Sequence, residues 1–365
     1  MLSKKINNLE SLRGFAALMV ALFHFQIGGL LTSNSLIKHG NLGVDFFFVL
    51  SGFVITENYL SKLNNFNELI KFQIKRFWRL YPLHIFVLLL WVIVEFIKLF
   101  ILNHSSINPS VEAFKGLKSI GNLVESIFLV QAIFEDDYVW NNVAWSLSTE
   151  FYTYIFFAIT VFIFKRISLL IFLIIVVVNY SSILKFDFLE GIFSNQFLKC
   201  INLFCMGVLT NYFYTKFKLL NIKTFEIISW ALLFLTIFAI SNKNQSFGII
   251  NFNIKNIYII FAFLIFFSST VKNTSVYSKF LNINFIQYLG KISYSLYMIH
   301  TLIGFFMKQI MRFVLKFDMI YLDGIAGYFK LESVQSNIAT IIYLFLCFVM
   351  SHLLYQFIEN RYRVR

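Results

Sequence analysis

Three side chains that could do chemistry in the first part of the chain are Arg13, His24 and Asp45, and all three lie inside apolar segments. Arg13 and His24 lie in the apolar run 12–31, and Asp45 lies near the start of the run 42–60. An ionisable group at membrane depth costs about 2.5–3.5 kcal/mol on insertion scales, so such residues indicate a functional site. A neutral imidazole can take a proton from a hydroxyl group, whereas a guanidinium group binds anions. His24 is therefore a candidate general base, and Arg13 a candidate anion-binding residue.

The spacing of Arg13 and His24 places them on one face of a helix. Eleven residues amount to about three turns at ~100° per residue, or ~16 Å along the axis. Each residue also has an ordinary alternative: a structural histidine within a helix bundle, and an arginine that reaches lipid headgroups. Asp45 could complement a helix N-terminus, or pair with His24 or with a sugar hydroxyl. The common stripe of Arg13 and His24 predicts a polar track that runs into a helix bundle.

A second pair of arginines follows in the segment KFQIKRFWRLYPL. Arg76 and Arg79 are three residues apart, so they share one face of a helix. Two guanidinium groups on one face suit a pyrophosphate or a 3′-phosphate. The alternative is a positively charged membrane anchor with an aromatic belt at the cytoplasmic border.

An acidic residue occurs near the start of another predicted span. The motif WSLSTE places Glu150 about one and a half turns inside the outer end of the run 145–164. A carboxylate at that depth needs a partner. We expect this partner to be His24, with Glu150 either orienting the imidazole or carrying a second proton.

A polar stripe is predicted near the end of the chain. The motif GKISYSLYMIH places Tyr294, Tyr297 and His300 at three-residue spacing, on one face of a helix. This face is expected to line the polar track. We expect His300 to be a wall residue rather than a catalyst.

The composition excludes an ordinary soluble protein. Of 365 residues, 59% are hydrophobic and 13% are charged, whereas about a quarter of the residues of a soluble domain are charged. We expect one membrane-embedded domain over 1–365 with no appended soluble domain. The net charge of +13 suits anionic lipid headgroups better than nucleic acid, because the basic residues cluster between apolar runs. The three cysteines lack metal-ligand spacing, so no metal is expected.

The apolar runs predict an all-α, polytopic membrane helix bundle. The expected spans are 12–31, 42–60, 82–102, 145–164, 168–185, 196–215, 224–241, 256–271, 290–312 and 336–358. An eleventh run, 119–134, is short and interrupted by polar residues, so we expect it to lie on the outer face or to re-enter the membrane. Lys4, Lys5 and the basic residues between 71 and 79 favour cytoplasmic placement of the N-terminus. Ten spans then place the C-terminus on the same side.

With these motifs in place, the sequence resembles the acyltransferase-3 family of membrane acyltransferases, which includes O-antigen and exopolysaccharide O-acetyltransferases. The matching segments occur in the family's order: ESLRGFAALMVALFHF with Arg13 and His24, GVDFFFVLSGFVIT, KRFWRLYP with Arg76 and Arg79, WSLSTEFYTY, and GKISYSLYMIH. They span nearly the whole chain. The family is known for about ten helices, in agreement with the runs counted above.

The resemblance implies transfer of an acyl group, usually acetyl, from cytoplasmic acetyl-CoA or another acyl-CoA to a hydroxyl group. The acceptor would be a surface glycan or its lipid-linked precursor, and the location the bacterial cytoplasmic (inner) membrane. His24 would be the catalytic histidine, acting as base or as acyl relay with Glu150 or Asp45 beside it. Arg13, Arg76 and Arg79 would contact coenzyme A.

Two questions remain open at this stage. Since the chain ends shortly after its last predicted span, either the acceptor reaches the membrane or a separate extracytoplasmic partner completes the transfer. A transporter or flippase of lipid-linked glycans is the alternative function, because it would also combine basic inner loops with intramembrane His, Arg and Glu.

Overall fold

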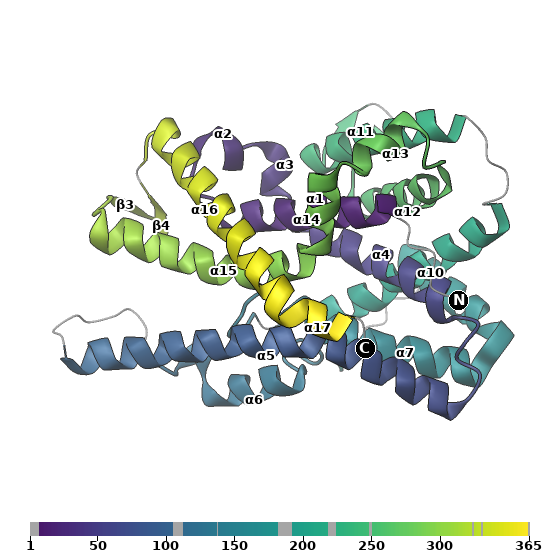
Figure 1. Ribbon diagram of the computed structural model, residues 1–365, viewed down its shortest axis with the longest axis horizontal. Coiled ribbons are helices and arrows are strands. Elements are labelled where there is room, and N and C mark those ends of the chain that lie inside the picture. The colour runs from purple at the N-terminus through teal and green to yellow at the C-terminus, as the bar shows by residue number, and fades with distance from the viewer. Residues whose placement is uncertain are drawn as a thin grey trace.

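The computed structural model describes residues 7–104, 112–136, 138–181, 192–217, 224–247, 250–322, 325–329 and 331–363. Within these residues the chain is helical apart from turns, loops and two short antiparallel hairpins (Figure 1). The predicted all-α class is therefore confirmed. Lys4 and Lys5, which carry the prediction for the N-terminus, lie outside the described residues.

The α-helices are α1 (Asn7–His24), α2 (Gly29–Thr32), α3 (Ser35–Lys38), α4 (Leu42–Tyr59), α5 (Phe66–His104), α6 (Ile120–Phe128), α7 (Trp145–Phe164), α8 (Ser168–Ser181), α10 (Asn195–Phe217), α11 (Thr224–Ser241), α12 (Ile254–Thr270), α13 (Val276–Leu281), α14 (Asn284–Lys291), α15 (Ser293–Gln309), α16 (Ser333–Leu354) and α17 (Asn360–Arg363). A π-helical turn extends α15 over Ile310–Val314, and another extends α16 over Tyr355–Glu359. The hairpins are β1 (Ser246–Phe247) with β2 (Ile250–Asn251), and β3 (Met319–Leu322) with β4 (Ile325–Phe329).

Each of the ten predicted spans is helical over most of its described length. Five helical segments in the described residues are long and apolar enough to cross a membrane: Leu42–Tyr59, Phe66–His104, Trp145–Tyr180, Thr224–Ser241 and Ser333–Tyr362. Their length and composition identify a polytopic membrane protein. This number is smaller than the ten expected, because the segment Trp145–Tyr180 contains two of the expected spans, 145–164 and 168–185, and the other helices are shorter or more polar.

Helix α1 ends earlier than the run 12–31 predicts. The helix stops at His24, and Gly28 and Gly29 then take positive φ values of 92° and 77°, a conformation open to glycine at little cost. A Cβ at position 29 would also lie 2.7 Å from the Asn337 side chain. His24 is consequently the last residue of its helix rather than a residue of mid-helix.

The segment 119–134 agrees with the expectation that it does not cross the membrane. Its helix, α6, has nine residues, which span about 14 Å against a hydrocarbon core of about 30 Å. The Ser119 side chain accepts a hydrogen bond from the Asn122 amide and begins the helix.

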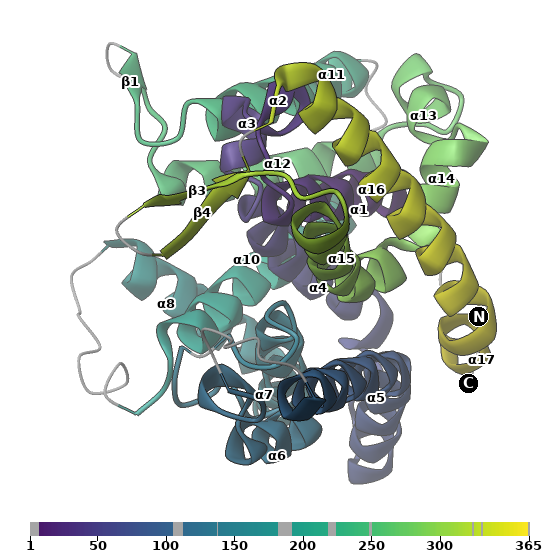
Figure 2. The ribbon, with the colours of Figure 1, turned by 90° about the vertical axis from the view of Figure 1, so that its left-hand side faces the viewer.

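The helices pack in two groups. Figures 1 and 2 show α5, α6 and α7 together on one side of α1, α4 and α15. Helix α5 contacts α7 and α15, and α17 at the end of the chain also reaches α5. The interface between these groups is where the polar side chains of the predicted motifs meet.

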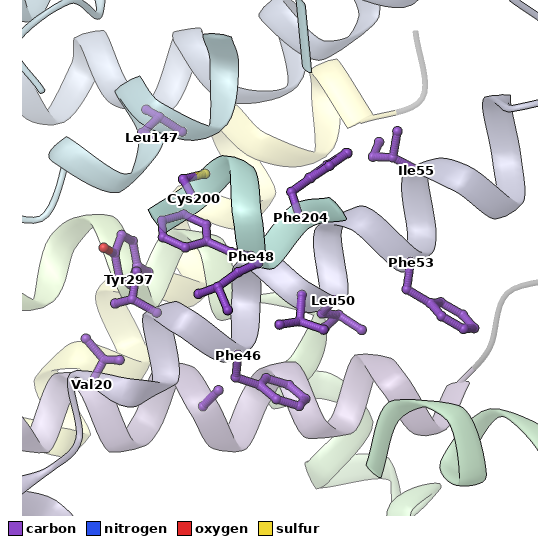
Figure 3. Packing of buried hydrophobic residues seen from close by; sticks show 14 of the residues in the cluster. Val20, Phe46, Phe48, Leu50, Phe53, Ile55, Leu147, Cys200, Phe204 and Tyr297 are labelled. Carbon is purple, nitrogen blue, oxygen red and sulfur yellow. The ribbon is translucent and has the colours of Figure 1, made fainter. Parts of the chain in front are cut away.

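Helix α4 is the centre of the hydrophobic core. Figure 3 shows its side chains Phe48, Leu50 and Phe53 together with Cys200 and Phe204 of α10. The two helices approach at backbone distance, because a Cβ added at Gly52 would lie 2.0 Å from the Phe204 carbonyl oxygen. A Cβ at Gly207 would lie 1.9 Å from the Val49 carbonyl oxygen. The absence of side chains at these two positions fixes α4 beside α10.

Candidate active site

A cavity of about 470 Å³ lies between α1, α4, α5, α7 and α15. Its lining includes six of the predicted site residues, contributed by four of these helices: Arg13, Arg76, Arg79, Glu150, Tyr294 and Tyr297. The structure thus collects side chains that are far apart in the sequence. Among the described residues, the lining does not include His24, His300 or Asp45.

One part of the cavity is basic. Arg76 and Arg79 lie on α5, one turn apart, and Arg13 approaches from α1. The Arg76 guanidinium donates a hydrogen bond to the Tyr59 hydroxyl at 3.2 Å and lies 5.3 Å from the centre of its ring. Its buried Nε has no hydrogen-bond partner among the described residues. Arg76 therefore keeps a donor that an anionic ligand could engage.

Two acidic residues that the sequence analysis did not identify share this cavity. Glu10 lies one helical turn before Arg13, and Glu57 accepts a hydrogen bond from Asn211 at 3.0 Å. Glu10 could have been found by its three-residue spacing from Arg13. The three lining arginines are thus accompanied by the carboxylates of Glu10, Glu57 and Glu150.

Glu150 belongs to a hydrogen-bonded cluster within the cavity. Its carboxylate accepts hydrogen bonds from the hydroxyl groups of Ser51 and Tyr154, which lie 3.0 Å from each other. The partner expected from the sequence was His24, and the structure corrects this pairing. Ser51 lies in the motif FFFVLSGF of α4, so this partner of Glu150 comes from the span 42–60, two spans earlier in the chain.

The tyrosines of α15 anchor that helix to its neighbours. The Tyr294 hydroxyl donates to the Leu80 carbonyl oxygen at 2.6 Å. The Tyr297 hydroxyl donates to the Val143 carbonyl oxygen at 2.9 Å and lies 2.7 Å from the Ser146 hydroxyl. Both tyrosines line the cavity, as the polar stripe predicts, and both also hold helices together.

The two histidines lie next to each other beyond Tyr297. The His300 ring is 5.9 Å from the Tyr297 ring, and the His24 ring is 5.0 Å from the His300 ring. His24 Nδ1 lies 3.1 Å from His300 Nε2. His300 is fully buried, whereas His24 is half-buried. The His300 ring thus lies next to both His24 and the cavity-lining residue Tyr297.

Asp45 has its polar contacts with residues outside the predicted site. Its carboxylate forms an ion pair with Lys199 at 3.1 Å and accepts a hydrogen bond from the Tyr258 hydroxyl at 3.0 Å. Asp45 is 2% exposed. The expected pairing with His24 is therefore not the arrangement in the structure. Asp45 instead connects α4 to α10 and α12.

The family comparison agrees with these motifs. A family model described as an acyltransferase domain matches residues 6–359. The chain therefore belongs to the acyltransferase-3 family, and the resemblance seen in the sequence is confirmed. Together with its long apolar helices, this membership identifies a membrane acyltransferase. No curated protein and no solved structure matches the chain.

Proposed function

We propose that the protein is a membrane O-acyltransferase that moves an acyl group, acetyl in the simplest case, from acyl-CoA to a hydroxyl group of a surface glycan or its lipid-linked precursor. The observation that carries this proposal is the shared cavity of Arg13, Arg76 and Arg79 in a chain of the acyltransferase-3 family. Coenzyme A is a polyanion, and one arginine guanidinium group can bind a phosphate group through two parallel hydrogen bonds.

The donor would lie with its phosphates against Arg76 and Arg79. We expect this part of the cavity to face the cytoplasm, where acyl-CoA is made. The pantetheine arm would then extend along Glu150 toward Tyr297, since both residues line the same cavity.

His24 would act as the general base of the transfer. Its imidazole takes the proton of the acceptor hydroxyl while the hydroxyl oxygen attacks the thioester carbonyl carbon. The carbon–sulfur bond then breaks, and the coenzyme A thiolate receives the proton from the imidazolium. In the relay variant, His24 Nε2 attacks the thioester carbon and the coenzyme A thiolate leaves. The hydroxyl oxygen then takes the acyl group from the acyl-imidazolium, the bond from the acyl carbon to Nε2 breaks, and the hydroxyl proton goes to the thiolate. Both routes require a movement that opens the cavity toward His24, because the lining includes Tyr297 but not His24, and the Tyr297 ring lies 5.9 Å from the His300 ring.

Purified protein in detergent or nanodiscs provides the direct test. Incubation with labelled acetyl-CoA and the host's lipid-linked saccharide is expected to yield a labelled ester and free coenzyme A in equal amounts. His24→Gln is expected to abolish both products. His104→Gln is the matched control, because His104 is exposed at the end of α5 and, among the described residues, its recorded contacts are with Phe100 of the same helix.

Two outcomes would contradict the proposal. Ordinary transfer by His24→Gln would remove His24 from the mechanism. Movement of the saccharide across a vesicle membrane without a covalent change would favour a flippase. Mass spectrometry of the surface polysaccharide, with and without the gene, would identify the acyl group and the acceptor, because each lost ester changes the mass by one acyl group.

A further inference from the structure

We propose that His300 is a positioning residue that holds His24 in the tautomer with its proton on Nδ1, so that Nε2 is the basic atom. This inference rests on the proposed function, in which His24 is the base. It gives His300 a role that the sequence analysis did not assign, since that analysis expected a wall residue.

The contacts of the two rings carry the argument. His24 Nδ1 lies 3.0 Å from the Val20 carbonyl oxygen and 3.1 Å from His300 Nε2. His300 Nδ1 lies 3.2 Å from the Leu296 carbonyl oxygen. A carbonyl oxygen only accepts hydrogen bonds, and a neutral imidazole has one donor and one acceptor nitrogen. Each Nδ1 must therefore carry the proton to make its contact with a backbone carbonyl.

This assignment leaves complementary atoms between the rings. With its proton on Nδ1, His300 presents a lone pair at Nε2, and this lone pair accepts from the same His24 N–H that points to Val20. Three-centre hydrogen bonds, in which one N–H serves two acceptors, are common at helix termini. His24 Nε2 is then left with its lone pair and is available to a substrate hydroxyl.

The opposite tautomers would be unfavourable at two places. If His300 Nε2 were the donor, the unprotonated His24 Nδ1 would face the Val20 carbonyl oxygen at 3.0 Å. The unprotonated His300 Nδ1 would also face the Leu296 carbonyl oxygen at 3.2 Å. Two lone pairs opposed at hydrogen-bond distance in a buried site cost free energy.

The surrounding structure holds the two rings at this distance. The Tyr343 hydroxyl of α16 donates to the carbonyl oxygens of Ala21 and His300, at 3.0 and 3.3 Å. Its ring is stacked on Phe25, with centroids 3.9 Å apart and an interplanar angle of 11°. Tyr343 thereby connects the backbone of α1 next to His24 with the backbone of His300 itself.

The contacts of His24 Nδ1 persist when His24 becomes charged. When Nε2 takes a proton, Nδ1–H remains bonded to Val20 and to the neutral His300 Nε2. A neutral acceptor that faces the imidazolium stabilises its charge. The proton then returns from His24 Nε2 to the leaving thiolate, and His300 ends the cycle unchanged.

Nitrogen-15 NMR of histidine-labelled protein tests the tautomer without any measurement of activity. The His24 signals, assigned by their loss in His24→Gln, are expected to show a protonated Nδ1 and an unprotonated Nε2. A protonated Nε2 with a bare Nδ1 would overturn the inference. Since this readout does not depend on acyl transfer, it stays decisive even if the proposed function fails.

Activity measurements test the role of His300. His300→Asn can still donate to Leu296 but loses the acceptor atom opposite His24, and its kcat is expected to fall about 10- to 100-fold with little change in KM, as for other residues that orient a functional histidine. His300→Gln can offer its Oε1 in place of Nε2 and is expected to recover most of the loss. His84→Asn is the control, because His84 is an equally buried histidine that bonds the Ser126 carbonyl oxygen away from the cavity.

The result for His300→Asn separates the two proposals. Full activity in this variant, together with an inactive His24→Gln, would refute the role of His300 and leave the proposed function intact. An equal loss in His300→Asn, His300→Gln and His84→Asn would show only a structural need for buried histidines, and would also refute it.

Discussion

The contact between α4 and α10 makes Gly52→Ala a strong test of the packing. The alanine Cβ would lie 2.0 Å from the Phe204 carbonyl oxygen, whereas carbon–oxygen contacts of this type occur at about 3.3 Å or more. The helices would have to separate by about 1 Å. Neither side can yield by a rotamer change, because both contacting groups belong to the backbone or are attached directly to it.

The expected loss follows from this displacement. Overpacking of a well-packed core costs about 1–3 kcal/mol, and a gap of this size removes a quarter to a half of the dispersion energy along the contact. The unfolding midpoint of the purified protein, followed by tryptophan fluorescence in detergent, should then decrease by about 1–4 °C. Ser51 precedes Gly52 and contacts Glu150, so acyl transfer should decrease as well.

Gly121→Ala is the matched control for this experiment. Gly121 also lies in a helix, but the nearest atom to an added Cβ is the Ser119 hydroxyl at 3.9 Å. Alanine is the better helix former by about 0.5–1 kcal/mol, so this variant should be as stable as the wild type or slightly more stable. A Gly52→Ala protein with an unchanged midpoint would refute the backbone contact between α4 and α10.

Three further predictions concern the site. Arg79→Gln should raise the KM for the acyl donor about 10- to 100-fold with kcat unchanged at saturation, because one charged hydrogen bond contributes about 1.5–3 kcal/mol. Arg166→Gln is the control, because Arg166 is exposed. An unchanged donor KM in Arg79→Gln would exclude Arg79 from the donor site. Glu150→Ala should destabilise the protein by about 1–3 kcal/mol, because it leaves two hydroxyl groups without their acceptor, and Glu150→Gln should destabilise it by less. Equal unfolding midpoints for the two variants would contradict the hydrogen-bonded cluster. Lys199→Met should lower the free energy of unfolding by about 3–5 kcal/mol, because it leaves the buried Asp45 carboxylate without its cationic partner. The double variant with Asp45→Asn should recover most of that stability. A double variant that is stable but inactive would show instead that Asp45 takes part in catalysis.

The helices could be predicted from the sequence, because a membrane allows few backbone structures other than helices. Backbone groups in hydrocarbon must be hydrogen-bonded within their own segment, so long apolar runs form helices. The early end of α1 could not be predicted from hydropathy. It depends on the backbone conformation of Gly28 and Gly29 and on their contact with α16. Local hydropathy does not contain that information.

The sequence predicts which site residues share one face of a helix, but it does not predict which of these faces contact each other. Three-residue spacing placed Tyr294 and Tyr297 on one side of a helix, and both line the cavity. Spacing does not tell which faces of different helices meet. The partner of Glu150 is 99 residues away and that of His24 is 276 residues away. Both pairings therefore required the folded structure.

The position of Tyr297 has a consequence for the membrane itself. A water-filled passage joining the arginine cavity to the half-buried His24 would be a leak for protons and small ions. Tyr297 packs edge to face against Phe47, with centroids 6.0 Å apart, and aromatic constrictions of this kind exclude water from a pore. In the proposed mechanism, this contact would let the arginine cavity stay open between turnovers while the bilayer retains its electrochemical gradient.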